Sequence, residues 1–292
     1  MERTKAVIRQ VKKIELSTKH LVDGLIAGNY HSIFKGQGIE FSDIRDYRPG
    51  DDIRAIDWKV TARFNHPYIK EFIEERDLHV YFIFDYSASG SFGSRCAKRQ
   101  KAIELTATLM FSAMRNNDNV GLSIFTDRVE TFIPARKGRR HVLKLISCLV
   151  THQPRSMTTD LQQALVHASH VIRRKSVIFI VSDFLDQDFV TPLRILRNRH
   201  DVIAIRVHDR REQQIPDVGL IELEDEESGE QLLVDTSDET FRQNYQRMVR
   251  AEKRKLDALF RKHRIDTVDI ESDGSYELPL KNFFRMRKRR LC

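Results

Sequence analysis

Three apolar runs, separated by stretches with helical spacing, restrict the possible folds of this chain more than any other feature. The runs cover residues 78–85, 176–184 and 201–207 and are rich in Val, Ile and Phe. Apolar runs without polar alternation are typical of strands buried on both faces, and helices between such strands cover a mainly parallel sheet. The sequence therefore predicts an α/β fold with a doubly wound, mainly parallel sheet.

The stretches around these runs fit the same fold. Further strands are expected at residues 119–127, 128–135 and 264–270, and a hairpin with an acidic tip at residues 219–235. Apolar side chains recur with helical spacing in residues 98–117, 138–152, 159–175, 191–200 and 237–262. We expect Thr159 or Asp160 to cap the third of these helices, and a capping box from Thr236 to Glu239 to open the last.

Composition and hydrophobic periodicity divide the chain into four segments. They are an amphipathic helix at residues 1–27, a small β-rich module at residues 28–76, the α/β domain at residues 77–272 and a basic tail at residues 273–292. Gly and Pro punctuate short alternating runs in the second segment, which favours short strands and turns over a helix of ordinary length.

Charge and composition exclude some classes of protein. The chain carries 50 basic and 42 acidic residues, a net charge of +8, and its apolar runs are far shorter than the roughly 20 residues of a transmembrane helix. The basic N-terminus lacks the apolar core and cleavage site of a secretory signal, so we expect a cytoplasmic protein. Basic clusters could bind nucleic acid or an anionic membrane, but they are interleaved with acids and are interpreted as solvated surface. Cys96, Cys148 and Cys292 indicate neither a disulfide framework nor a zinc site.

Oxygen-bearing side chains follow the first buried strand in the pattern DxSxS, as Asp85, Ser87 and Ser89. Ligands of open α/β sheets bind beyond the carboxyl ends of the strands, where Thr159 and Asp183 would supply another hydroxyl and another carboxylate. Such hard oxygen ligands suit Mg²⁺, and Mn²⁺ and Ca²⁺ are also compatible. The alternative is that Asp85 and Asp183 only cap the helices that follow them. Their shared placement favours a metal site with one position open for the carboxylate of a partner.

These positions and a segment upstream resemble two known families. The metal-ion-dependent adhesion site of von Willebrand factor A domains is matched by Asp85, Ser87, Ser89, Thr159 and Asp183. Residues 36–63, followed by residues 70–77, resemble the defining segment of the bacterial proteins called domain of unknown function 58. The positions that fall on that pattern are Glu40, Phe41, Arg45, Tyr47, Pro49, Gly50, Asp51, Asp52, Arg54, Asp57, Trp58, Ala62 and Arg63.

The resemblance implies a von Willebrand A-type domain fused to a small N-terminal module. Members of this family are often associated with MoxR-type AAA ATPases, which are regarded as assembly chaperones, so such an ATPase or its client is the expected partner. Many longer relatives carry transmembrane helices. The sequence of this chain shows none, so a membrane-anchored role is not expected.

The module at residues 28–76 mixes charges densely. Its basic and acidic side chains include Arg45, Arg48, Arg54 and Arg63 with Asp43, Asp46, Asp51, Asp52 and Asp57. They form either a docking surface for a partner or an ion-pair network that fixes the module onto the α/β domain. Bidentate pairs between Arg and carboxylates are geometrically specific, and the proximity of Phe41 and Trp58 favours the structural network.

Three functions compete. The favoured one is a non-enzymatic, metal-dependent interaction module whose cation bridges the five ligand residues to an acidic side chain of a partner. A metal-assisted hydrolase at the same site is the second, but the sequence has no P-loop and no evident general base. The third, binding of nucleic acid or membrane by the basic clusters, lacks the interleaved aromatic residues of a stacking platform.

Overall fold

The structure is a computed structural model, and it describes residues 9, 11–16, 18, 40–64, 66–73, 78–88, 98–186, 188–224 and 230–291. The chain divides into two compact units. One unit is Lys35–Leu78, and the other combines Met1–Phe34 with His79–Cys292. The predicted module at residues 28–76 falls largely on the first unit, although its residues 28–39 lie outside the described part of the chain.

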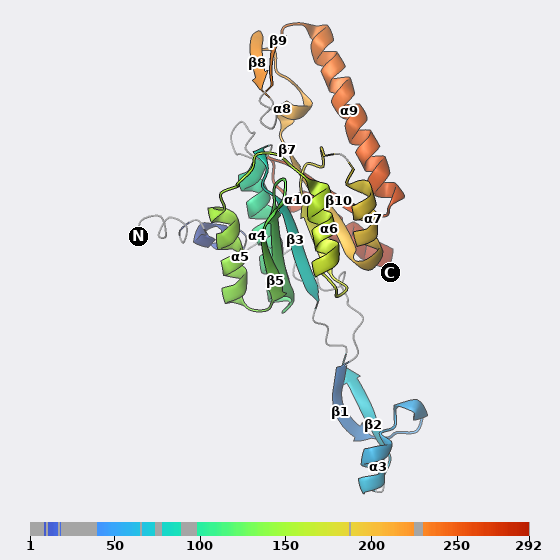
Figure 1. Ribbon diagram of the computed structural model, residues 1–292. Coiled ribbons are helices and arrows are strands. Elements are labelled where there is room, and N and C mark those ends of the chain that lie inside the picture. The colour runs from blue at the N-terminus through green and yellow to red at the C-terminus, as the bar shows by residue number, and fades with distance from the viewer. Residues whose placement is uncertain are drawn as a thin grey trace. The chain divides into compact units, whose positions relative to one another are not determined.

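A six-stranded sheet forms the centre of the larger unit (Figure 1). Its strands lie in the order β10-β7-β6-β3-β4-β5, and all neighbours are parallel except β4 and β5. The strands are β3 (His79–Asp85), β4 (Asn119–Phe125), β5 (Val129–Arg136), β6 (Val177–Val181), β7 (Asp201–His208) and β10 (Asp266–Glu271). The chain order reverses between β3 and β6, so these two strands flank the topological switch point of a doubly wound sheet. The predicted fold class is confirmed.

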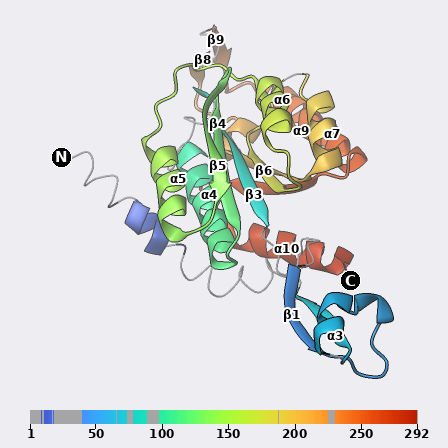
Figure 2. The same ribbon diagram turned by 60° about the horizontal axis from the view of Figure 1, so that its bottom comes forward.

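Helices cover both faces of this sheet (Figure 2). The described helices that follow β3 in the chain are α4 (Lys98–Arg115), α5 (Arg139–Thr151), α6 (Leu161–Val171), α7 (Val190–Arg199), α8 (Arg210–Gln213), α9 (Glu239–Lys262) and α10 (Glu277–Leu291). Helices α4 and α5 lie on one face, and α6, α7 and α9 on the other. Since successive side chains of a strand point to opposite faces, Ile83 packs in the cluster that includes Leu161, Leu193 and Phe260. Burial on both faces explains why the sequences of the central strands are continuously apolar.

A hairpin forms a small sheet of its own in the larger unit, and the long helix α9 follows it. Strands β8 (Leu220–Glu224) and β9 (Gln231–Asp235) pair antiparallel, as predicted. The predicted capping box is wrong, because the side chain of Asp238 accepts the bond from the backbone N–H of Thr240 and caps α9. The hydroxyl of Thr236 instead donates to the carbonyl of Gly219 over 2.6 Å and accepts from the N–H of Val218 over 3.0 Å. Thr236 thus closes the base of the hairpin.

The smaller unit pairs β1 (Glu40–Asp46) with β2 (Tyr68–Ile73) and carries the short helices η2 (Ile53–Ala55) and α3 (Trp58–Phe64) between them. It is therefore of mixed composition, with only two strands among its described residues.

A bidentate ion pair joins two described residues within this unit. Both carboxylate oxygens of Asp51 accept bonds from the guanidinium of Arg45, over 2.7 and 2.8 Å. These bonds, with one from the backbone N–H of Arg48, lower the pKa of Asp51 to about 2. Asp52 and Asp57 accept backbone N–H groups of the short helices that follow them. The acids of the family motif therefore serve the local fold of this unit.

Both ends of the chain contribute to the larger unit. The described residues near the N-terminus are helical, with Val11 and Ile14 buried. The predicted basic tail at residues 273–292 is not a separate segment, because α10 packs on β10 and buries Leu280, Phe283 and Phe284. Among the described helices, none is long and apolar enough to cross a membrane.

Candidate metal centre

Two carboxylates meet a shared pocket at the switch point of the sheet. Asp85 is the last residue of β3, and Asp183 follows the end of β6. The two strands run parallel with Phe84 opposite Val181, so both acids leave the same edge of the sheet. Asp85 and Asp183 line one pocket, whose other lining residues are Phe84, Ser87, Lys98, Arg99, Ala102, Val181, Ser182 and Val207.

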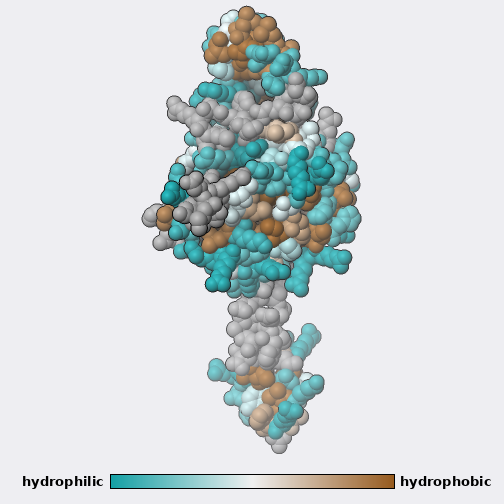
Figure 3. Space-filling view, turned by 60° about the vertical axis from the view of Figure 1, so that its left-hand side comes forward, coloured by the Kyte–Doolittle hydropathy of each residue, from teal (hydrophilic) through white to brown (hydrophobic). Residues whose placement is uncertain are grey.

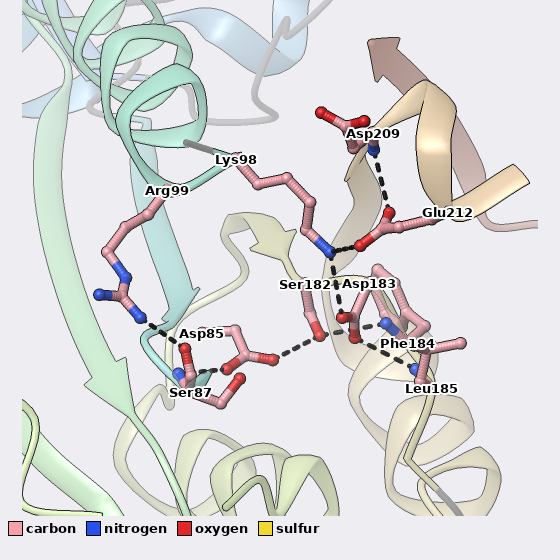
Figure 4. A network of polar contacts seen from close by, with 10 residues as sticks. All are labelled: Asp85, Ser87, Lys98, Arg99, Ser182, Asp183, Phe184, Leu185, Asp209 and Glu212. Carbon is pink, nitrogen blue, oxygen red and sulfur yellow. Dashed lines mark hydrogen bonds and ion pairs between the residues drawn. The ribbon is translucent and has the colours of Figure 1, made fainter. Parts of the chain in front are cut away.

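Asp85 is held by a short turn and by a hydroxyl from the neighbouring strand (Figure 4). Its Oδ1 accepts the N–H of Ser87 over 3.0 Å, and its Oδ2 accepts the hydroxyl of Ser182 over 2.7 Å. Burial, followed by the negative charge of Asp183, raises the pKa of Asp85 to about 6 in spite of these bonds. Ionisation of Asp85 is therefore unfavourable in the metal-free site, and a bound cation would stabilise the ionised form.

Asp183 is less completely bonded. Its Oδ1 accepts a long bond of 3.3 Å from the N–H of Leu185, whereas its buried Oδ2 accepts no hydrogen bond from the described residues. The ammonium of Lys98 lies 3.7 Å from that Oδ2, an ion pair without hydrogen-bond contact. Buried carboxylate oxygens normally have partners, so this acid of the pocket lining keeps an oxygen whose bonding capacity is unused.

Lys98 bonds primarily to a different acid. Its Nζ donates to Oε1 of Glu212 over 2.6 Å, and its side chain is only 5% exposed. The other oxygen of Glu212 accepts the N–H of Asp209 over 2.9 Å, in the capping box of α8. Lys98, a buried lysine at the start of α4, pairs with both Asp183 and Glu212 and thus links the acid pair to the segment after β7.

Arg99 holds the turn after Asp85. Its Nη2 donates to the carbonyl of Ser87 over 2.6 Å, and its guanidinium lies 4.6 Å from the centre of the Tyr86 ring. The hydroxyl of Tyr86 donates to the carbonyl of Leu149 on α5. Arg99 therefore fixes the backbone that presents Ser87 to the pocket.

The five residues predicted as ligands are placed differently. Asp85, Ser87 and Asp183 line the same pocket. Thr159 is half-buried and lies outside that lining, on a loop that is joined to the turn by the bond from Ala88 N–H to the Met157 carbonyl, 2.9 Å. The side chain of its neighbour Asp160 accepts a hydrogen bond from the backbone N–H of Gln163 and so caps α6. Ser89 lies outside the described residues.

The donors present fit a hard divalent cation. Asp85 and Asp183 supply carboxylate oxygens, and Ser87 and Ser182 supply hydroxyls, which is the oxygen chemistry that Mg²⁺, Mn²⁺ and Ca²⁺ prefer. Within the described part of the chain, no group of three or more His, Cys, Asp or Glu side chains is arranged to hold a metal. The site is therefore leaner in charge than an all-acidic cage, and its free coordination positions would go to water or to a partner.

Three residues of this site are not among the ligands predicted from the sequence, although one of them could have been found. Ser182 directly precedes Asp183 at the end of an apolar run, a position that a search for hydroxyls beside the predicted ligands would find. Lys98 and Glu212 carry no such signal, because they are 114 residues apart and meet only in the folded chain.

Strand order and the acid pair at the switch point define the class of this protein, a doubly wound α/β domain with a candidate oxygen-ligand centre at its carboxyl edge. The chain belongs to the protein family of unknown function DUF58, whose family model matches residues 43–255. The predicted family membership is thereby confirmed.

Relatives and solved structures extend this comparison. The uncharacterized protein Rv1480 of Mycobacterium tuberculosis is 36% identical over 75% of this chain and 70% of its own length. The uncharacterized protein YeaD of Bacillus subtilis is 25% identical over 44% of this chain and 29% of its own length. The crystal structure of the conserved hypothetical protein BatB from Bacteroides thetaiotaomicron aligns with 73% of this chain and 99% of its own, at 15% identity and a TM-score of 0.47.

Proposed function

We propose that this protein is a non-enzymatic, metal-dependent interaction module that acts in the cytoplasm with a MoxR-type AAA ATPase, in assembly or chaperone-like work. Asp85, Ser87, Ser89, Thr159 and Asp183 would hold the cation, most favourably Mg²⁺. A bound cation supplies an open coordination position for an acidic side chain of the ATPase or its client. The negative charges of the two carboxylates and the positive charge of Lys98 set the affinity for the cation.

One observation carries this proposal. Asp183 lines the same pocket as Asp85 and has a buried Oδ2 without a hydrogen bond from the described residues, and burial, followed by the negative charge of Asp183, raises the pKa of Asp85. A fold keeps such a repulsive pair where a cation compensates it.

The composition of the pocket supports binding over turnover. The described lining contains no His or Cys, and both of its acids are proposed ligands, so no lining acid is left to act as general base. A screen for metal-dependent hydrolysis of phosphoesters tests this point. Turnover that disappears in Asp85→Ala would assign the hydrolase function instead.

The interaction itself is tested by measuring the affinity for the MoxR-type ATPase in Mg²⁺ and in EDTA. We expect wild-type protein to bind about tenfold or more tightly with Mg²⁺, because a desolvated metal–carboxylate contact contributes at least about 1.4 kcal/mol. Asp85→Ala and Asp183→Ala should remove this dependence. Glu252→Ala, at an acid of α9 with 60% side-chain exposure, is the matched control. Equal affinities in Mg²⁺, in EDTA and in Asp85→Ala would refute the proposal.

A further inference from the structure

The β8–β9 hairpin exposes an unusual amount of apolar surface. Leu220, Leu232 and Leu233 are 68%, 64% and 70% exposed, and Val218 at its base is 60% exposed. The space-filling view shows these strands as a hydrophobic surface at the top of the molecule (Figure 3). A cluster of exposed leucines on a short element marks an interaction site more often than scattered single residues do.

Both faces of the hairpin contribute to this surface. Leu223 lies opposite Leu232 in the antiparallel register, on one face. Leu233 follows Leu232 in β9, so its side chain points to the other face, where it lies opposite Glu222. Because β8 and β9 form a sheet of their own, packing on the core of the unit does not account for these leucines.

The two strands also leave backbone edges open. In the described part of the chain, β8 pairs only with β9, so each has one edge that no further strand covers. A two-stranded hairpin is marginally stable by itself, and an apolar open edge is a template for another strand. The hairpin is held at its base, where Arg242 of α9 bonds to the carbonyl of Thr236 and pairs with Asp217 over 3.4 Å. The base of the hairpin is thus bonded to α9, whereas the outer edges of β8 and β9 are available for pairing with a further strand.

The charge of this region is opposite to that of the whole chain. Residues 213–241 contain no Lys or Arg and ten Asp or Glu, in a chain with a net charge of +8. Glu222, Glu224 and Glu230 are exposed beside the leucines. This surface would repel an anionic membrane or nucleic acid and attract a segment that carries both apolar and basic side chains.

We infer that the β8–β9 hairpin is a docking edge for an extended segment of a partner protein in which apolar and basic residues alternate. Such a segment adds a third strand by backbone hydrogen bonds. Its apolar side chains cover the leucines of one face, and its Lys or Arg side chains meet the glutamates. Binding at the hairpin needs no cation, so it is independent of the proposed metal-dependent contact.

A short synthetic peptide in which Leu and Lys alternate is a direct probe. We expect it to bind the full chain in a fluorescence anisotropy titration, equally in Mg²⁺ and in EDTA. The double variant Leu223→Ser/Leu232→Ser should weaken binding about tenfold or more, because it removes the two directly opposed leucines of the covered face. Its unfolding midpoint should not change, since both side chains are exposed. The control is Leu278→Ser/Met286→Ser, which removes two exposed apolar residues of α10.

Each outcome decides the inference. Weakening in the hairpin variant alone, together with no binding of a peptide in which Leu and Glu alternate, supports it. No binding of the Leu/Lys peptide, or equal affinity in both double variants, overturns it. Concentration-dependent dimers that the hairpin variant abolishes would assign the edge to a second copy of this chain and would also overturn it.

Discussion

Two clusters of buried charge in the larger unit differ in how completely their charges are balanced. Arg206 of β7 has a side chain only 8% exposed, and it donates two bonds to the carboxylate of Asp269 and one to Asp257. Lys253 lies 3.5 Å from Asp269, so two acids meet two cations. At the candidate metal centre, three acids meet one buried lysine, and the guanidinium of Arg99, which also lines the pocket, bonds to the carbonyl of Ser87.

The comparison separates a structural cluster from a functional one. The Arg206 cluster has bidentate geometry and matched charges, which is what a buried ion pair needs to offset its desolvation. The candidate centre keeps an unbonded oxygen on Asp183 and a raised pKa on Asp85. The first cluster should therefore respond to mutation as part of the fold, and the second as a binding site.

The largest effect is expected from Arg206→Met. This change leaves Asp257 and Asp269 without their main partner and should cost about 3 kcal/mol of unfolding free energy, at the low end for buried pairs because both acids are about one-third exposed. Urea denaturation measures the loss, which should be the same in Mg²⁺ and in EDTA. Arg250→Met, at an exposed position of α9, is the control. A loss that disappears with Mg²⁺ would erase the distinction between the clusters.

The next effect is a dependence of stability on pH. The folded state of the metal-free protein keeps a proton on Asp85 up to about pH 6, whereas the unfolded state releases it near the usual carboxyl pKa of 3.8. The free energy of unfolding should therefore fall as the pH rises through this window, by at most about 3 kcal/mol. Urea midpoints in EDTA at a series of pH values measure this slope.

A comparison with Asp85→Asn isolates this contribution from that of the histidines, because the amide cannot ionise. The difference in stability between the variant and the wild type should grow with pH in EDTA. In Mg²⁺ the wild type should regain stability toward pH 7, since the cation competes with the proton for the carboxylate. Parallel pH curves for the two proteins in EDTA would contradict the raised pKa of Asp85.

The smallest effect concerns the charge of Lys98. Lys98→Met removes the positive charge beside Asp183, and at the effective dielectric constant of such sites we expect the affinity for Mg²⁺ to rise roughly tenfold. Isothermal titration calorimetry measures the dissociation constant. Lys101→Met, on the same helix but bonded to the carbonyl of Gly274, should leave it unchanged. An unchanged affinity in Lys98→Met would show that the lysine does not set the charge of the site.

Much of the fold follows from local patterns. Continuous apolar runs identify β3, β6 and β7, and helical spacing identifies the helices between them, because burial on both faces of a sheet demands that composition. The start of α9 was mispredicted for a local reason. Thr236 and Asp238 are both good caps, and the hydroxyl of Thr236 is used across the hairpin instead.

Sequence alone determined that two strands end in carboxylates and that the chain carries the motif of its family. Only tertiary structure decided which oxygens lack a hydrogen bond and which cation stands beside them, as with Asp183 and Lys98. It also decided that the leucines of the hairpin lie outside the core. The physical reason is that strand and helix periods act over a few neighbours, whereas pairing and burial of charge depend on groups far apart in the chain, such as Lys98 and Glu212 at a separation of 114 residues.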